Sequence, residues 1–113
     1  MKDGSPTIRP WTDPLTGQCP VADTLRILGG KHGARILHCL TAGELHFLEL
    51  QREMEGVSRK VLRAQLREFE ESGLVVRTPK RDARQRVGYA LTPKGSALGD
   101  ILGQLYDWQQ TFD

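Results

Sequence analysis

The sequence predicts a mainly α-helical domain that carries one small β-hairpin. Apolar residues recur at helical spacing in five segments of the 113-residue chain. Two short segments before the last of these helices alternate in polarity as half-buried strands do. Glycine or proline stands at most of the boundaries, where the chain needs turns and caps. The length suits one domain, and no apolar run approaches the roughly 20 residues that span a membrane.

The first two helices are predicted from their start and stop signals. Proline suits the first helical position, so a helix beginning at Pro20 leaves Cys19 as its N-cap. Gly29-Gly30 ends this helix, and a second helix is predicted over residues 31–40. The apolar residues at helical spacing are Val21, Leu25 and Leu28 in the first helix and Gly33, Ile36, Leu37 and Leu40 in the second.

A turn at Gly56 separates the next two helices, predicted over residues 47–55 and 59–72. Residues 44–46 are a candidate strand before them. Ser58 is a favoured N-cap for the later helix, and Gly73 suits the position after its end. The apolar stripes are Phe47, Leu50 and Met54 in the earlier helix and Val61, Leu62, Leu66 and Phe69 in the later one, whose opposite side carries Arg59, Lys60, Arg63, Ala64 and Arg67.

Two strands and a long helix complete the predicted fold. In the first strand Leu74, Val76 and Thr78 alternate with Val75 and Arg77, and in the second Val87, Tyr89 and Leu91 alternate with Gly88 and Ala90. The loop over residues 79–86 is polar and basic, as expected of a solvated hairpin tip. Thr92-Pro93 is a strong helix start, and the last helix reaches Phe112.

The positive charges are clustered although the net charge is only +2. Nine of the 16 Lys and Arg residues fall in one window: Arg59, Lys60, Arg63, Arg67, Arg77, Lys80, Arg81, Arg84 and Arg86. The acids in this window are Glu68, Glu70 and Glu71, which are grouped at one helix end, and Asp82. Two basic patches, 59–67 and 77–86, therefore remain. Such local clustering favours contact with nucleic acid phosphates over a merely solvated surface.

The order of these elements is that of a winged helix-turn-helix, in which a hairpin wing follows two helices joined by a glycine turn. The second helix of this motif places its N-terminal residues near base edges in the major groove. The predicted DNA-binding residues of this recognition helix are Ser58, Arg59, Lys60, Arg63 and Arg67. Those of the wing, which would contact a neighbouring backbone or minor groove, are Lys80, Arg81, Arg84 and Arg86.

The last helix predicts a homodimer. Its apolar stripe is longer than a small domain easily covers, and exposed patches of that size usually mark an interface; the alternative is that the helix folds back on its own core. The candidate interface residues are Leu98, Ile101, Leu102, Leu105, Trp108 and Phe112. We expect an irregular arm over residues 1–18, a DNA-binding unit over 19–92 and a dimerisation helix over 93–113, all in one structural domain.

Several segments resemble the HxlR family of MarR-like winged-helix regulators. They include Cys19-Pro20-Val21, Gly29-Gly30-Lys31, Gly56-Val57-Ser58, Glu70 to Val75 and Arg86 to Thr92. The resemblance covers Cys19 to about Trp108. It implies a homodimeric regulator, commonly a repressor, that binds palindromic operator DNA. It also implies that Cys19 is a candidate sensor of oxidants or electrophiles. The chain departs from the family at His32, where tryptophan is usual, and at Gly88, where an acid is usual.

The sequence allows more than one role for each cysteine. A thiolate at the Cys19 N-cap gains from unpaired N–H groups and the helix dipole, which favours reactivity; alternatively Cys19 only caps the helix. Cys39 adjoins an apolar stripe and is expected to act as a small buried hydrophobe, with a resolving role for Cys19 as the alternative. His32, His38 and His46 with Cys39 lack the recurring spacing of metal ligands. We predict no metal and no cofactor.

Three other functions fit the sequence less well than a DNA-binding regulator does. A winged-helix protein-interaction module would have little need of basic residues on both recognition helix and wing. A metal-responsive regulator lacks ligand motifs, and an enzyme lacks a phosphate loop, a nucleophile elbow or paired carboxylates. The polar N-terminus carries no signal-like apolar stretch, so we expect a cytoplasmic regulator. Its inducer, if it has one, is expected to be a small molecule or an electrophile.

Overall fold

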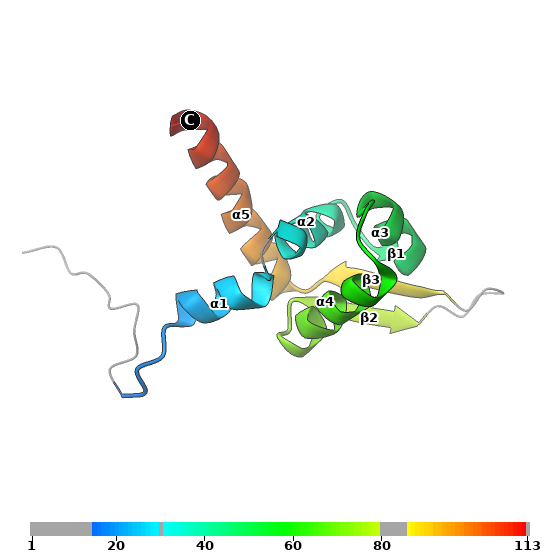
Figure 1. The fold of residues 1–113 in the computed structure, drawn as a ribbon, viewed down its shortest axis with the longest axis horizontal. Coiled ribbons are helices and arrows are strands. Elements are labelled where there is room, and N and C mark those ends of the chain that lie inside the picture. Colours follow the sequence, from blue (N-terminus) through cyan, green and yellow to red (C-terminus); the bar gives the residue numbers. More distant parts are fainter. Residues whose placement is uncertain (1–14, 30, 80–85, 113) are drawn as a thin grey trace, which may run out of the picture.

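The computed structural model describes residues 15–29, 31–79 and 86–112. These residues form, in order, α1 (Pro20–Leu28), α2 (Lys31–Leu40), β1 (Leu45–His46), α3 (Phe47–Glu53), α4 (Arg59–Glu71), β2 (Val75–Pro79), β3 (Val87–Leu91) and α5 (Pro93–Phe112). The β2–β3 hairpin and α5 extend from the body of the fold in different directions (Figure 1). The predicted helices and strands are confirmed, with α3 ending two residues and α4 one residue earlier than expected.

The α1–α2 corner is built on a close backbone approach. Gly29 ends α1 in the left-handed region at φ 67°, and its N–H donates to the carbonyl oxygen of Arg26. A Cβ on Gly33 would lie 1.6 Å from the carbonyl oxygen of Leu28, so only glycine fits where α2 passes the end of α1. The predicted stripe of α2 is buried, but of the α1 stripe only Leu28 is; Val21 and Leu25 are exposed.

Helix α4 is capped at both ends as the sequence predicts. The Ser58 hydroxyl accepts the N–H of Val61 at 3.1 Å. At the other end Gly73 takes a φ of 76°, and the N–H of Leu74 donates to the carbonyl oxygen of Phe69 at 2.9 Å, as in a Schellman motif. Leu62, Leu66 and Phe69 are fully buried, but Val61 is exposed. The prediction for Val61 was wrong because it lies about 100° around the helix from Leu62.

The described strands form one antiparallel sheet in the order β1-β3-β2. Leu45 pairs with Tyr89, and Val75 pairs with Leu91. The predicted alternation in the first strand of the hairpin is wrong: Leu74 and Val75 are both buried, whereas Val76 and Thr78 are both exposed. Strand β2 leaves the core after Val75, whereas β3 keeps Val87, Tyr89 and Leu91 in contact with it.

The core lies where α2, α3 and α4 meet the base of the sheet. Its buried residues are Leu28, Ile36, Leu37, Leu40, Phe47, Leu50, Met54, Leu62, Leu66, Phe69, Leu74, Val75 and Tyr89. Arg35 of α2 forms a hydrogen bond with α3 by donating to the carbonyl oxygen of Glu53, its last residue, at 2.9 Å. In the described ranges, no helix is long and apolar enough to cross a bilayer.

Helix α5 is anchored along its first half, where Leu98 and Leu102 also pack against the core. The Thr92 hydroxyl accepts the N–H of Gly95 at 3.0 Å, and the Lys94 ammonium donates to the carbonyl oxygen of Ser72 at 2.7 Å. A Cβ on Gly95 would lie 2.0 Å from the carbonyl oxygen of Leu74, so the first turn sits directly on the backbone after α4. Every described residue beyond Leu102 is exposed.

Candidate nucleic-acid interface

One side of α4 presents an exposed row of cations. The side chains of Arg59, Lys60, Arg63 and Arg67 are all exposed, while the opposite side of the same helix is buried. Ser58, which caps the helix, is exposed as well. Arg59, Lys60 and Arg63 lie in the first turns of α4, where the positive end of the helix dipole also favours phosphate groups. Arg67 continues the row toward the other end of the helix.

Two of these arginines lie over an aromatic ring. The guanidinium carbon of Arg63 lies 4.3 Å from the centre of the Phe47 ring, and that of Arg59 lies 5.7 Å from it. Both distances are within the range of cation–π attraction. The apolar spacing in the sequence predicts Phe47 only as part of the stripe of its helix. Spacings of 12 and 16 residues across a turn carry no signal for such a contact.

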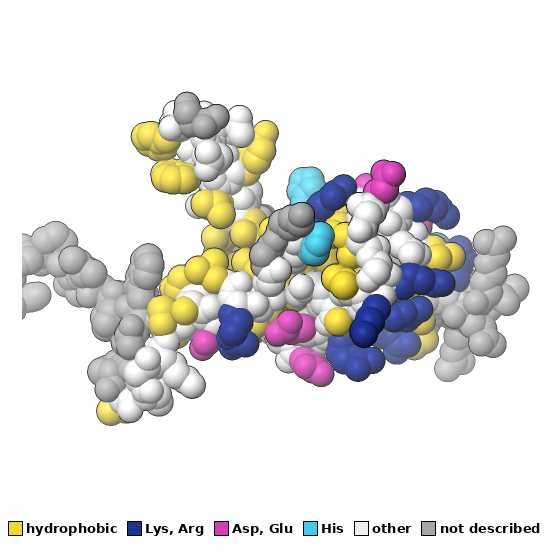
Figure 2. Space-filling model, in the orientation of Figure 1, with side chains coloured by type: hydrophobic (Ala, Val, Ile, Leu, Met, Phe, Trp, Pro, Cys, Tyr) yellow, Lys and Arg dark blue, Asp and Glu magenta, His cyan; other side chains and the backbone are white. Residues whose placement is uncertain are grey.

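The described part of the wing adds further cations. Arg77 on β2 and Arg86 before β3 are exposed, whereas the predicted contacts Lys80, Arg81 and Arg84 lie outside the described residues. Figure 2 shows dark blue basic side chains gathered over the region of α4 and the hairpin. The recognition-helix cations and the described wing cations thus lie toward the same part of the molecule.

A carboxylate next to this surface is held in its charged form. Glu49 accepts the backbone N–H of His46 at 2.8 Å, and its carboxylate lies 3.2 Å from Nδ1 of His46. That backbone hydrogen bond, followed by the charges of His46, Arg52 and Arg86, lowers the pKa of Glu49 below its ordinary value. At neutral pH Glu49 is therefore an anion that offsets part of the positive charge on this side of the molecule.

Gly88 stands where an acid is usual in the family that the sequence resembles, and the structure places an acid from another segment next to it. A Cβ on Gly88 would lie 1.9 Å from a carboxylate oxygen of Glu44. An acid is thus present beside this point of the wing strand, but it comes from the loop before β1 and not from the strand itself. A side chain at position 88 would require Glu44 to move.

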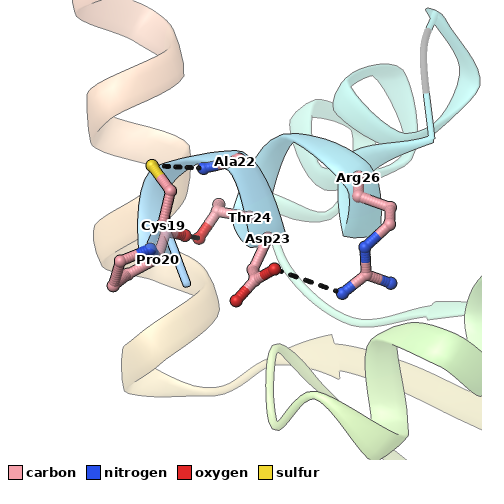
Figure 3. Close-up of polar contacts among 6 residues, drawn as sticks. All are labelled: Cys19, Pro20, Ala22, Asp23, Thr24 and Arg26. Atoms are coloured by element: carbon pink, nitrogen blue, oxygen red, sulfur yellow. Dashed lines mark hydrogen bonds and ion pairs between the residues drawn. The ribbon is translucent and has the colours of Figure 1, made fainter. Parts of the chain in front are cut away.

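Cys19 is the N-cap of α1, as predicted. Its Sγ accepts the N–H of Ala22 at 3.4 Å, and the Asp23–Arg26 ion pair lies one turn further on (Figure 3). The thiol is half-buried and free of any disulfide. Solvent can therefore reach a sulfur atom that already interacts with the start of a helix.

Cys39 is a half-buried free thiol that packs against the core, close to the environment expected for it. Burial, with a smaller contribution from the negative charge of Glu53, raises the pKa of Cys39 above its ordinary value. A raised pKa keeps the sulfur as a thiol and lowers its reactivity. In the part of the chain that the structure describes, no three His, Cys, Asp or Glu side chains come together as a metal site.

An apolar surface lies away from the cations. On α5, Ile101, Leu105, Trp108 and Phe112 are more than half exposed, and Leu25 of α1 is 62% exposed. Trp108 and Phe112 contact each other with ring centres 5.9 Å apart. A groove of about 200 Å³ between α1 and α5 is lined in part by Ile27, Leu98 and Ile101. Hydrophobic side chains stand along both helices in Figure 2.

Helix-turn-helix, hairpin wing and long terminal helix together define the chain as a winged helix-turn-helix protein. Residues 27–113 match the HxlR-like helix-turn-helix family, to which this chain belongs. The uncharacterized HTH-type transcriptional regulator YtcD of Bacillus subtilis is 38% identical over 88 residues, which cover 78% of this chain and 70% of YtcD. The relatives are named as transcriptional regulators, so the protein is a regulator and not an enzyme.

Solved structures of similar proteins have the same fold. The redox regulator HypR in its oxidized form matches with a TM-score of 0.75 and 32% identity, over 84% of this chain and 98% of HypR. The reduced form of the transcriptional regulator YodB from B. subtilis matches with a TM-score of 0.75 and 29% identity, over 84% of this chain and 94% of YodB. The family predicted from the sequence motifs is therefore confirmed.

Proposed function

We propose that the protein is a DNA-binding transcriptional repressor that binds a palindromic operator as a homodimer. The observation that carries the proposal is the exposed row of Arg59, Lys60, Arg63 and Arg67 on one side of α4, opposite its buried side. In helix-turn-helix proteins this part of the second helix enters the major groove, where arginine pairs with guanine O6 and N7. Arg77 and Arg86 extend the positive surface to the wing.

The dimer in this proposal is formed by the apolar surface of α5 together with α1. The exposed apolar side chains that support it are Leu25, Ile101, Leu105, Trp108 and Phe112, because an extended exposed apolar surface usually marks an interface. A second copy packed along α5 would cover them. It would also set two recognition helices about one turn of DNA, roughly 34 Å, apart.

The test is selection of bound sequences from a randomised DNA pool, followed by fluorescence-anisotropy titration at fixed salt. We expect a palindromic consensus. Arg59→Ala and Arg63→Ala should each weaken binding to it by roughly 1–3 kcal/mol where the side chain reads a base. We assign Arg67, further along α4, to a phosphate contact, so Arg67→Ala should weaken binding to all sequences alike and reduce the salt dependence. Unchanged affinity in both Arg59→Ala and Arg63→Ala would refute the recognition-helix assignment.

A thiol switch at Cys19 is a second element of the proposal. Its support is the half-buried Cys19 sulfur at the start of α1 and the similarity to HypR, a redox regulator. Operator binding should then fall after diamide treatment and return with dithiothreitol. Cys19→Ser should be insensitive to diamide, and Cys39→Ser, the matched control, should respond as the wild type does. Binding that ignores diamide would leave Cys19 as a helix cap alone.

A further inference from the structure

The Phe47 ring stands where the two helices of the helix-turn-helix meet. Phe47 is the first residue of α3 and is only 9% exposed. Its side chain belongs to the core cluster, so its position is fixed by packing. One ring face is nevertheless covered by Arg63 at 4.3 Å, with Arg59 at 5.7 Å. A rigid aromatic ring therefore lies under two flexible cations that are themselves exposed.

The chemistry of this contact suits base recognition. The electron-rich face of an aromatic ring attracts a guanidinium group, and a guanidinium stacked on a ring keeps its N–H donors at its edge, free for another partner. An arginine in open solvent loses much of its rotamer freedom when it binds a base. An arginine already ordered by a ring loses less, so its bidentate pairing with guanine is favoured.

We propose that Phe47 is a positioning residue that orders Arg63, and more weakly Arg59, for sequence-specific contact with DNA. The inference rests on the proposed DNA-binding function and assigns to a core residue a part in its specificity. Burial alone would be satisfied by any apolar side chain of similar size, whereas ordering of the guanidinium needs the ring. Arg67 lies on the same helix without a ring contact among the described residues, so it provides the comparison.

The test is a double-mutant cycle on the selected operator, combining Phe47→Leu with Arg63→Ala. Phe47→Leu should lower affinity for the operator by about two- to fivefold, the range for a cation–π contact at an exposed site. It should leave affinity for random DNA unchanged. In the Arg63→Ala background, Phe47→Leu should have little further effect. In the Arg67→Ala background it should have its full effect, because Arg67 does not use the ring.

Controls separate positioning from packing. Phe47→Tyr keeps the ring and should keep operator affinity, whereas Phe47→Met, a second ring-free variant, should behave as Phe47→Leu does. Thermal unfolding identifies any loss caused by destabilisation. The proposal would be overturned if removing the ring lowers operator affinity equally with and without Arg63. It would also be overturned if neither Phe47→Leu nor Phe47→Met lowers operator affinity. If the wild type itself shows no sequence preference, the DNA-binding function fails first, and the positioning role falls with it.

A measurement without DNA tests the geometry in the wild-type chain. The Arg63 δ-methylene protons should show upfield ring-current shifts by NMR, and the Arg63 side chain should be more ordered than that of Arg67. Both differences should vanish in Phe47→Leu. Random-coil shifts for Arg63 in the wild type would overturn the proposal even if operator binding is specific.

Discussion

Single residues decide where the elements of this fold can approach each other. Gly33 and Gly95 both lie where a Cβ would collide with a backbone carbonyl oxygen of a neighbouring element. Gly33 lies in the apolar stripe predicted for α2, but its burial reflects contact with the backbone of Leu28. The prediction that Val61 is buried failed for a related reason. A hydrophobic side chain on a helix is buried only if its direction meets another element, and that direction depends on packing that the sequence does not display.

Gly33→Ala should destabilise the fold. The added Cβ would meet the Leu28 carbonyl oxygen at 1.6 Å, and the resulting shift of α1 against α2 should cost roughly 1–3 kcal/mol. Thermal unfolding should show a clear drop in Tm. Gly103→Ala is the matched control, because its Cβ would meet no atom within 4 Å. That variant should be neutral or more stable by about 0.5–1 kcal/mol, and a similar drop in both would contradict the argument.

The lowered pKa of Glu49 predicts that the stability of the fold depends on pH. Its pKa is lowered in the folded protein, so its ionised form stabilises the fold above the unfolded pKa, and this contribution is lost as pH falls through the folded value. Glu49→Gln should therefore be less stable than the wild type in urea unfolding at neutral pH. The difference should shrink as pH falls through the folded pKa of Glu49, because the wild-type carboxyl then becomes protonated too. A difference that is constant with pH would contradict this role.

Helices and strands were the most predictable elements of this protein. Their ends follow from caps that are visible in the sequence, such as Cys19-Pro20, Ser58 and Thr92-Pro93. The pairing of β1 with β3 was not predictable, because a two-residue strand has too little pattern to identify its partner. The DNA-binding roles of the recognition helix remain predictions. Their local setting, an exposed basic side opposite a buried stripe, could be derived from periodicity alone.

Gln65 of α4 is hydrogen-bonded to the end of α1. Its side-chain amide nitrogen donates to the carbonyl oxygen of Ile27 at 3.0 Å, and its Oε1 would lie 2.7 Å from a Cβ on Gly29. The middle of α4 thus holds the end of α1, the helix that begins at Cys19. A change at the start of α1 has a direct physical connection to the recognition helix.

Gln65→Ala should weaken this connection. Loss of the hydrogen bond should lower stability by roughly 0.5–1.5 kcal/mol, and amide hydrogen exchange should accelerate in α1 more than in α3. Arg67→Ala, an exposed change on the same helix, should leave exchange in α1 unaltered. Uniform acceleration over all helices in Gln65→Ala would indicate general destabilisation and would contradict a local tie.

At the scale of the whole molecule, opposite kinds of surface are separated. Cations gather around α4 and the hairpin, and apolar side chains stand along α5 and α1 (Figure 2). The alternative that α5 folds back on its own core holds only for Leu98 and Leu102, which are partly buried against it. The sequence showed that the stripe exists but not how much of it one chain can cover, because coverage depends on where the helix is anchored.

Leu105→Glu should convert a dimer to a monomer. Leu105 is 56% exposed in one chain, and a charge buried in an apolar interface without a partner is strongly unfavourable. Light scattering after size exclusion should give the monomer mass, with helical circular dichroism preserved. Gln110→Glu adds the same charge about 140° away around α5 and should remain dimeric. Equal masses for Leu105→Glu and the wild type would exclude this face of α5 from the interface.

The attachment of α5 has a mechanical consequence. Its 20 residues make a helix of about 30 Å. Only its first half is held, by the contacts of Lys94 and Gly95 with the backbone that follows α4 and by Leu98 and Leu102 against the core. In the proposed dimer, a tilt of the whole helix by about 10° would displace its distant end by about 5 Å, given a 1.5 Å rise per residue. The position of the second subunit would therefore depend on how α5 is attached. The distance between the two α4 helices of the proposed dimer should then vary with the angle at which α5 leaves the rest of the fold.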